Sequence, residues 1–276
     1  MRPQPLGGRL ESQLPPQRDP LPLRGRVALV TGASRRAGIG YAIARRLAAL
    51  GASLFLHHCA RHDQDQPWGA DPGGPQAVVA GVTEALAGGA GVHHIELDLA
   101  AAGAPGQLMD VATRAFGHLD ILVCNHARSG GDGPLGTLDA AMLDAHWAVN
   151  ARSTILLTQA FAAQHDGRPG GRVIFMTSGQ DLGPMRDEVA YAASKGALAS
   201  IARTLADQLA ERAITLNTVN PGPIDTSYAP PDVHDRGGLD RGGRLEGRGS
   251  DGGSEAGGGG AGPVGGPGGC SGSRAS

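Results

Sequence analysis

Short runs of consecutive apolar residues alternate along the chain with segments in which apolar residues recur every three or four positions. The runs predict buried strands, and the periodic segments predict amphipathic helices. Six strands are predicted in this way, at residues 27–30, 53–56, 92–97, 120–124, 172–177 and 214–219. Helices are predicted between them, at about 39–50, 76–87, 105–116, 138–165 and 191–211. Continuous apolar strands that alternate with helices are typical of an α/β fold with a doubly wound parallel sheet covered on both faces.

Two terminal segments lie outside this pattern. Residues 1–24 are rich in Pro, Gln and Arg and lack the apolar run of a signal peptide, so we expect a disordered Pro-rich extension. Residues 229–276 are dominated by Gly, Arg, Asp and Ser. Such a segment buries too little apolar area to offset the loss of chain entropy, so we expect a disordered Gly-rich tail. The pattern predicts one domain, over residues 25–228.

Composition excludes several classes of partner. The net charge is −2 and aromatic residues make up 3 % of the chain, which disfavours a nucleic-acid-binding surface. No apolar run approaches the roughly 18 residues that cross a bilayer. Three cysteines far apart in the sequence suggest neither a disulfide framework nor a CxxC metal site. We therefore expect a cytoplasmic protein with a small-molecule partner and neither a nucleic acid nor a membrane.

A glycine-containing loop, residues 31–40, joins the first predicted strand to the first predicted helix. Glycines let the backbone approach a pyrophosphate, and the helix N-terminus offers free N–H groups and a partial positive charge. Its position between a strand and an amphipathic helix distinguishes this loop from an ordinary turn. The sequence thus predicts a Rossmann-type nucleotide site, for which the candidate residues of this loop are Gly32, Ser34, Arg35, Arg36, Gly38, Ile39 and Gly40.

The end of the second predicted strand bears on the choice of cofactor. In a Rossmann unit an acidic residue there binds the ribose 2′-OH of NAD, but here the position is occupied by His57 and His58. Guanidiniums are available in the loop at Arg35 and Arg36, and guanidiniums suit a 2′-phosphate. The sequence therefore favours NADP(H) over NAD(H). Adjacent histidines on a strand point to opposite faces and cannot chelate by themselves, so no metal is predicted.

The candidate chemistry lies in Tyr191-Ala192-Ala193-Ser194-Lys195. Tyr and Lys four positions apart share one face of a helix, and an ammonium beside a phenol favours the phenolate. Lys195 is thus expected to lower the pKa of Tyr191 from about 10, which suits proton transfer near neutral pH. Ser178 follows the fifth predicted strand, at the edge where open α/β sheets bind ligands. By itself a Tyr-x3-Lys pair is more typical of a half-buried Tyr beside a solvated Lys than of a catalytic pair.

With these pieces in order, the chain resembles the short-chain dehydrogenase/reductase family, and most closely its bacterial 3-oxoacyl-[acyl-carrier-protein] reductases. The resemblance covers about residues 25–228. The matching motifs are the Thr31-Gly32 loop, Asp98, Asn125, Asn150, Ser178, Tyr191, Lys195, and Pro221-Gly222 with Thr226. Several features in the family's order and spacing are far more specific than any one of them.

The resemblance implies a role for each residue of the chemical step. Tyr191 would protonate a carbonyl oxygen as hydride arrives from the nicotinamide, and Ser178 would orient that oxygen by a hydrogen bond. Lys195 would bind the nicotinamide ribose and tune Tyr191. Asn150 would hold a water that relays protons from solvent. In this scheme the cofactor supplies the hydride, and the protein supplies orientation and a matched acid.

The resemblance also implies the rest of the cofactor site. Asp98 would contact the adenine amino group, and Asn125 would lie near the adenosine ribose. The residues that would border the nicotinamide carboxamide and the pyrophosphate are Pro221, Gly222, Ile224 and Thr226. His58 and Leu99 complete the predicted cofactor-binding set, together with Tyr191 and Lys195. The implied function is reduction of a 3-oxoacyl thioester with NAD(P)H, and the family's members are expected to be homo-oligomers.

The chain departs from the family's pattern in three places. The usual Gly-x3-Gly-x-Gly spacing is stretched by two residues, so that a bulge carries Arg35 and Arg36. The family's Asn-Asn-Ala-Gly run appears as Cys124-Asn125-His126-Ala127. After residue 228 no seventh strand and no substrate-covering helical segment are recognisable, and the tail resembles a reading frame shifted between about residues 232 and 239. A helix and a Val-rich strand encoded in another frame of the DNA would test this hypothesis.

Two alternatives follow from these departures. One is a catalytically impaired remnant that acts at most as a nucleotide-binding module. The other is an NAD-dependent dehydrogenase of alcohols or sugars.

Overall fold

The computed structural model describes residues 19–222, 224 and 226. The Gly-rich tail and the hypothesis of a shifted frame lie outside the described residues, as do residues 1–18 of the N-terminal extension. Residues 19–24, which we assigned to that extension, form a turn in which Leu23 packs against the core. The backbone N–H of Leu23 donates to Leu50 O at 3.0 Å. The folded region therefore includes residues before position 25.

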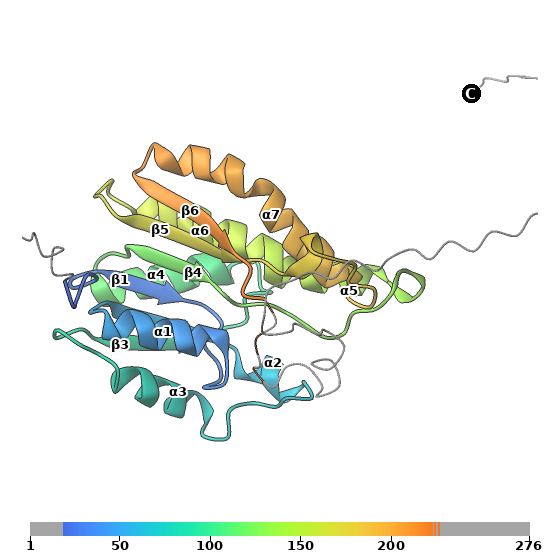
Figure 1. The fold of residues 1–276 in the computed structure, drawn as a ribbon, viewed down its shortest axis with the longest axis horizontal. Helices are drawn as coiled ribbons and strands as arrows, with labels where there is room; N and C mark the ends of the chain where they lie inside the picture. The colour runs from blue at the N-terminus through green and yellow to red at the C-terminus, as the bar shows by residue number, and fades with distance from the viewer. Residues whose placement is uncertain (1–18, 223, 225, 227–276) are drawn as a thin grey trace, which may run out of the picture. The chain divides into compact units, whose positions relative to one another are not determined.

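The described residues form one parallel sheet of six strands, in the order β3-β2-β1-β4-β5-β6 (Figure 1). The strands are β1 Val27–Val30, β2 Ser53–His58, β3 Val92–Glu96, β4 Ile121–Cys124, β5 Gly171–Met176 and β6 Ile214–Val219. The strand order reverses between β1 and β4, since β2 and β3 lie on one side of β1 and the later strands lie on the other. The predicted doubly wound Rossmann-type sheet is confirmed. Among the described strands, β6 lies at one edge.

Helices connect successive strands. They are α1 Ile39–Ala49, α2 Ala60–Gln64, α3 Gly74–Thr83, α4 Ala104–Phe116, α5 Ala140–His146, α6 Ser153–Gln164 and α7 Val189–Ala210. Between α5 and α6 lies a π-helical turn, η2 Trp147–Arg152, and two short 3-10 turns are η1 Leu135–Thr137 and η3 Gly179–Asp181. The helix predicted over 138–165 is therefore three successive helical segments. No helix in the described part of the chain is long and apolar enough to cross a membrane.

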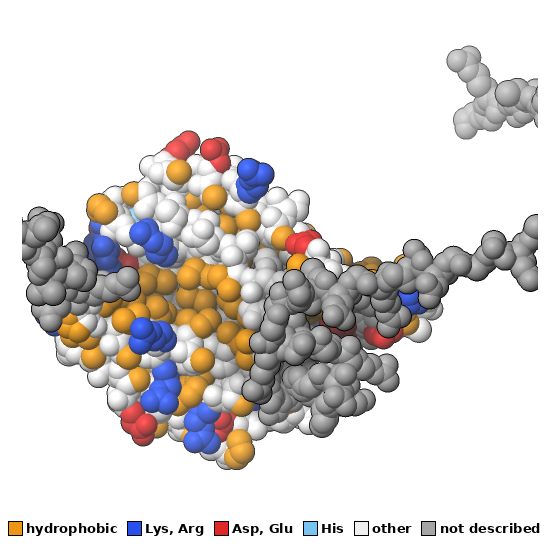
Figure 2. Space-filling model, viewed as in Figure 1, with side chains coloured by type: hydrophobic (Ala, Val, Ile, Leu, Met, Phe, Trp, Pro, Cys, Tyr) orange, Lys and Arg blue, Asp and Glu red, His pale blue; other side chains and the backbone are white. Residues whose placement is uncertain are grey.

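Two apolar layers hold the sheet. On one face Leu29, Leu122 and Phe175 are buried with side chains of α4, α6 and α7. On the other face Ala28 and Val30 are buried with side chains of α1 and α3. Alternate residues of one strand enter opposite layers, as the period of a β-strand requires. Hydrophobic side chains also gather on the visible surface between α1 and β6 (Figure 2).

The register of the sheet brings the loops of the predicted site together. Val30 pairs with Leu56 of β2 and with Val123 of β4. Cys124 pairs with Phe175 of β5, and Met176 pairs with Val219 of β6. Because all strands are parallel, the segments that follow them emerge at the same edge of the sheet. This edge, at the point where the strand order reverses, is where open α/β sheets bind ligands.

Candidate functional site

Two glycines, one in the β1–α1 loop and one in the first turn of α1, allow this loop to approach the end of β4 closely. Gly32 has φ of 70°, and a Cβ there would lie 2.7 Å from His126 Cα. A Cβ on Gly40 would lie 2.6 Å from Asn125 Nδ2 and 2.7 Å from Gly32 O. Asn125 Nδ2 donates to the carbonyl oxygens of Thr31 and Gly32, both at 3.1 Å. The loop is thus bound tightly to the end of β4.

The start of α1 has the features of an anion-binding site. Gly38 is its N-cap, no described side chain caps it, and its first turn carries no acidic residue. The first N–H groups of such a helix are left to a ligand, and the helix dipole favours negative charge there. Ser34 faces the end of β2, where its Oγ accepts the backbone N–H of Cys59 at 3.2 Å. The loop and helix start therefore fit the pyrophosphate of a dinucleotide.

The two arginines of the bulge are both paired with carboxylates of the segment after β2. The Arg36 guanidinium and backbone N–H all donate to Asp71, with Nη2 2.9 Å from Oδ1. The hydrogen bond from Arg36 lowers the pKa of Asp71 to about 2. Arg35 Nε lies 3.3 Å from Asp63 Oδ1, and its Nη1 donates to Thr226 O at 3.2 Å. The expectation of available guanidiniums is therefore wrong for this structure, because both are engaged.

The bulge has this arrangement because α2 and the following loop fold back over it. Trp68 of that loop lies under Arg35, 5.7 Å from the guanidinium carbon to the ring centroid, and donates from Nε1 to Asp63 Oδ1 at 3.1 Å. The two extra residues of the β1–α1 loop thus have a structural partner. Arg35 and Arg36 are joined by ion pairs and ring contact to the segment between β2 and α3, beside the predicted cofactor site.

Histidines at the ends of β2 and β4 are buried in the site. His57 donates from Nε2 to Leu97 O at 2.8 Å, and its Nδ1 accepts the N–H of Gly32 at 3.3 Å. Burial lowers the pKa of His57 to about 4, and it lowers the pKa of His126 well below the ordinary value of an imidazole. His126 Nδ1 lies 2.6 Å from Thr31 Oγ1, and its Nε2 lies 2.7 Å from Ser153 Oγ. Both imidazoles are therefore neutral at pH 7, and their hydrogen bonds hold the ends of β2 and β4 in place.

His58 stands where a Rossmann unit for NAD has its acid. Its Nε2 lies 3.1 Å from His94 Nδ1, and the two rings stack with centroids 5.3 Å apart. Burial, and then His94, lower the pKa of His58. Its buried Nδ1 has no hydrogen-bond partner among the described residues. The end of β2 thus presents a neutral imidazole instead of a carboxylate.

Asp98 and Leu99 follow β3 directly. Asp98 is exposed, and its Oδ1 accepts the N–H of Ala100 at 2.8 Å, which closes a turn. Leu99 is buried in the core. Their predicted contacts with the adenine remain predictions.

Lys195 and Tyr191 lie together at the end of β5, as their spacing predicts. Lys195 Nζ is 5.6 Å from the centroid of the Tyr191 ring and donates to Met176 O at 2.8 Å. Lys195 is 2 % exposed, and this burial lowers its pKa to about 8. Ser178 follows two residues after Met176 and is half-buried. The solvated lysine that an accidental Tyr-x3-Lys pair suggests is not what the structure has.

The side chain of Asn150, within the π-helical turn, is fully buried and bonds to neighbouring segments. Its Oδ1 accepts the N–H of Arg128 at 2.6 Å, and its Nδ2 donates to Arg128 O at 3.1 Å and to Ser194 Oγ at 2.9 Å. The Ser194 hydroxyl in turn donates to Tyr191 O at 2.7 Å. The side chain that we expected to hold a relay water instead bonds protein groups on both sides. Its predicted part in proton relay remains a prediction.

The segment after β6 approaches the bulge. Gly222 has φ of 69°, and its N–H donates to Asn220 Oδ1 at 3.0 Å. Pro221 precedes it, and Ile224 is 51 % exposed. Thr226 is held through its carbonyl by Arg35. The structure therefore brings the Pro-Gly segment toward the β1–α1 loop.

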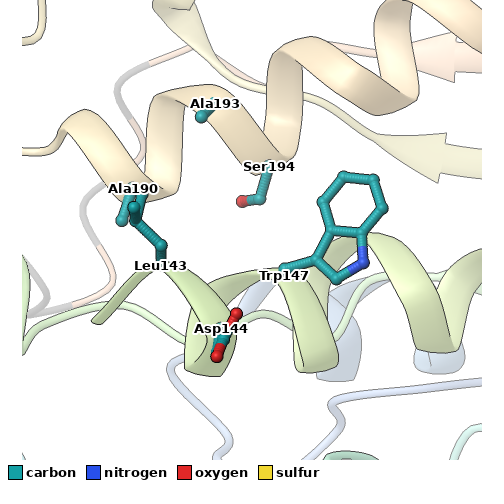
Figure 3. A pocket seen from close by; sticks show the side chains of 6 residues that line it. All are labelled: Leu143, Asp144, Trp147, Ala190, Ala193 and Ser194. Carbon is teal, nitrogen blue, oxygen red and sulfur yellow. The ribbon is translucent and has the colours of Figure 1, made fainter. Parts of the chain in front are cut away.

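A hollow of about 240 Å³ lies beside α7 but on the side away from the predicted chemistry. Its lining comes from α5, η2 and α7 (Figure 3): Leu143, Asp144, Trp147, Ala190, Ala193 and Ser194. At 100° per residue, Ala190 and Ala193 lie about 120° and 180° from the middle of the face that Tyr191 and Lys195 share, and Ser194 lies about 80° from it. The hollow is thus separate from the carbonyl site at the end of β5.

The sequence profile of short chain dehydrogenases matches residues 26–237. The chain belongs to the short-chain dehydrogenase/reductase family. The uncharacterized oxidoreductase YjdA of Bacillus subtilis is 38 % identical over 210 residues, which are 75 % of this chain and 78 % of that protein. A putative ketoacyl reductase of the granaticin polyketide synthase of Streptomyces violaceoruber is 35 % identical over 74 % of this chain and 69 % of its own.

A solved structure agrees with this assignment. The short-chain dehydrogenase/reductase from Serratia marcescens BCRC 10948 has a TM-score of 0.65 and 36 % identity, and the match covers 78 % of this chain and 82 % of that chain. The chain is therefore an oxidoreductase of this family, whose members use nicotinamide cofactors.

Three side chains support the site without having been predicted to do so. Thr31 Oγ1 receives the N–H of Asn125 at 3.0 Å, His57 holds the loop through Gly32, and Ser194 holds Tyr191. Thr31 and Ser194 lie inside the recognised motifs, so the sequence already placed them at the site, although it did not indicate what they bind. The sequence around His57 does not indicate this structural role, because its hydrogen-bond partners are 25 and 40 residues away.

A substitution at Gly40 tests the close approach in the cofactor loop. Gly40→Ala places a methyl group against the backbone of Gly32, and such overpacking costs about 1–3 kcal/mol. We expect a lower Tm and at least about tenfold weaker binding of NADPH, measured by thermal unfolding and fluorescence titration. Gly106→Ala in α4 is the matched control, because no described atom lies within 4 Å of its added Cβ. An unchanged affinity for NADPH in Gly40→Ala contradicts the prediction.

Proposed function

We propose that this chain is an NADP(H)-dependent ketoreductase whose substrate is a 3-oxoacyl thioester or a related ketone. The observation that carries the proposal is the buried Lys195 ammonium, 5.6 Å from the Tyr191 ring at the end of β5. The likeness to a ketoacyl reductase of a polyketide synthase supports the substrate class. Leu135 and Leu182, on the segments after β4 and β5, are each more than 80 % exposed and offer apolar surface to an acyl chain.

In this proposal the chain's residues provide the proton and the alignment. Tyr191 Oη donates its proton to the ketone oxygen, so that the phenolate remains on the protein. The nearby Lys195 ammonium stabilises that phenolate, because opposite charges within a few ångströms favour the ionised form. Ser178 Oγ donates a hydrogen bond to the same oxygen and fixes its orientation. A nicotinamide held beside these residues would supply the hydride for the carbonyl carbon.

The cofactor would be held at three places. The pyrophosphate fits the start of α1, which has neither a side-chain cap nor an acidic residue in its first turn, beside the closely packed Gly32 and Gly40. The adenosine half is assigned to the ends of β2, β3 and β4, at His58, Asp98, Leu99 and Asn125. The nicotinamide half is assigned to Lys195, Tyr191 and the segment from Pro221 to Thr226.

The preference for NADP(H) is supported by the end of β2. His57 and His58 stand there without a carboxylate, so nothing at that position repels a 2′-phosphate. Arg35 and Arg36 support it less than their charge suggests, because Asp63 and Asp71 pair with them. We propose that they shape the loop.

A steady-state comparison of the two cofactors tests this division of roles. The wild type is expected to have a lower KM for NADPH than for NADH. In Arg36→Ala, the loss of the Asp71 pair should raise the KM of both cofactors by a similar factor, since the loop and not the phosphate loses its partner. The ion pair of exposed Arg168 with Asp166 provides a control, and Arg168→Ala should change neither constant. A rise confined to NADPH would instead assign Arg36 to the 2′-phosphate.

A further inference from the structure

Asp132, in the loop between β4 and α5, is bound to the start of the helix that carries Tyr191. Its Oδ1 accepts the N–H of Ala190 at 3.0 Å, and its Oδ2 accepts the N–H of Tyr191 at 2.7 Å. Its own loop contributes a third donor, the N–H of Gly133, at 2.7 Å from Oδ1. Glu188, the residue at the N-cap position of α7, makes no side-chain cap. Asp132, 58 residues before Ala190 in the chain, caps the helix in its place.

The surroundings of Asp132 stabilise its negative charge. The Asp132 side chain is 4 % exposed. Burial on its own raises the pKa of Asp132, but the N–H groups of Tyr191, Ala190 and Gly133 outweigh it, so the pKa is lowered. The side chain is thus a carboxylate at neutral pH, placed where the dipole of a 22-residue helix favours negative charge.

His146 of α5 lies beside the same carboxylate. Its Nδ1 donates to Met142 O at 2.9 Å, which directs Nε2 toward Asp132 Oδ2 at 3.8 Å. The imidazole is fully buried, and Nε2 has no hydrogen-bond partner in the described part of the chain. The carboxylate is therefore enclosed by a histidine on one side and by the first turn of α7, which donates to it, on the other.

The backbone of Tyr191 is fixed at both of its polar groups as a result. Its N–H is bound by Asp132, and its C=O is bound by Ser194, whose hydroxyl is held by Asn150. Asp132 and Asn150 both belong to the chain that follows β4, one in its loop and one in η2. The residue proposed to donate the proton is thus anchored, through both its N–H and its C=O, to the part of the chain that follows β4.

We propose that Asp132 is a positioning residue of the reaction: it caps α7 and holds the backbone of Tyr191, so that the phenol stays within reach of the substrate oxygen. This rests on the proposed function, because it gives Tyr191 its part as the acid. Displacing a reacting group by a fraction of its hydrogen-bond length is costly to turnover, although binding of the cofactor elsewhere is unaffected.

The test compares two cap carboxylates. Asp132→Ala removes the cap of α7, and Asp139→Ala removes that of α5, where Asp139 Oδ1 accepts the N–H of Met142 at 2.8 Å. Both variants are expected to lose Tm, since each loses an N-cap. We expect kcat for an acetoacetyl thioester to fall about tenfold in Asp132→Ala alone, with the KM for NADPH within about twofold of the wild type. Asp132→Asn, which keeps one acceptor oxygen, should recover part of kcat and stands in if the alanine variant does not fold.

Hydrogen–deuterium exchange of residues 189–192 provides a readout that needs no turnover. It should accelerate in Asp132→Ala and stay unchanged in Asp139→Ala. Equal kcat in the two alanine variants, or unchanged exchange in Asp132→Ala, overturns the proposal. If the wild type itself reduces no ketone, the proposed function fails, and the exchange data alone decide whether Asp132 holds the start of α7.

Discussion

Tyr191→Phe is expected to lower kcat for the NADPH-dependent reduction of an acetoacetyl thioester by about 10³-fold, within the range that general acid catalysis contributes. The substitution removes one hydroxyl and leaves the ring beside Lys195. Asp132 and Ser194 bind the backbone of Tyr191, which the substitution leaves unchanged, so the fold should be retained. The KM for NADPH is therefore expected to stay within about threefold.

Tyr41→Phe is the matched control for this variant. Tyr41 also lies on a helix, α1, but its hydroxyl faces Gly81 of α3 and not the edge of the sheet where the strands end. Its activity should equal that of the wild type. The measurement is NADPH oxidation followed by absorbance, with purified protein and several ketone and alcohol substrates. A Tyr191→Phe variant that retains a tenth of the activity would contradict the assignment of Tyr191 as the acid.

The same assay separates the proposed enzyme from the two alternatives. A wild type that neither turns over a ketone nor binds NADPH would support the impaired remnant. A wild type that oxidises alcohols or sugars faster with NAD would support the dehydrogenase. The first outcome depends on whether the described six strands hold the site in place, and β6 lies at their edge with Val219 41 % exposed.

The sheet was predictable because buried parallel strands carry a strong local signal. Val27–Val30 is apolar at every position and coincides with β1. β2 continues through His57 and His58, beyond the predicted end, because tertiary hydrogen bonds hold those imidazoles inside. The five-residue helix α2 was not predicted, since its polar sequence has no apolar period. The π-helical turn at Trp147–Arg152 is a backbone feature that apolar periodicity does not encode.

The candidate site was predictable where a motif is local and unpredictable where partners are distant. Tyr191 and Lys195 share a helix face by their spacing alone. The pairing of Arg36 with Asp71 joins residues 35 positions apart across a loop without periodicity, so the arginines looked available. Asp132 reaches Tyr191 over 59 positions, and no local pattern marks it. A loop carboxylate becomes interpretable only when the fold shows which backbone N–H groups it meets.

Lys195 is the only lysine of the sequence, and the structure buries it where its charge is costly. Burial lowers its pKa from 10.5 to about 8, so its charged form destabilises the fold at pH 7 by about 3 kcal/mol. The hydrogen bond to Met176 O offsets part of this cost. A single lysine also permits a direct measurement, because ¹⁵N-lysine labelling gives one Nζ signal. Its NMR titration is expected to have a midpoint near 8.

Lys195→Met is therefore expected to reduce activity and increase stability together. Loss of the ammonium that stabilises the phenolate should lower kcat by about 10²-fold or more. The free energy of unfolding at pH 7 should rise by about 1 kcal/mol, the desolvation cost less the penalty of leaving Met176 O without its donor.

The lowered pKa of Lys195 also predicts how the stability of the wild type changes with pH. Between pH 8 and 10.5 the unfolded wild type holds a proton on Lys195 that the folded form has lost, so wild-type stability gains from rising pH in this window. Lys195→Met lacks that gain of about 3 kcal/mol, so its advantage of about 1 kcal/mol in urea unfolding should shrink above pH 8 and change sign before pH 10.5. A midpoint near 10.5 for Nζ, or a variant less stable than the wild type at pH 7, would show that the lysine costs the fold nothing. A variant that lost stability but kept its activity would remove Lys195 from the proton-transfer pair.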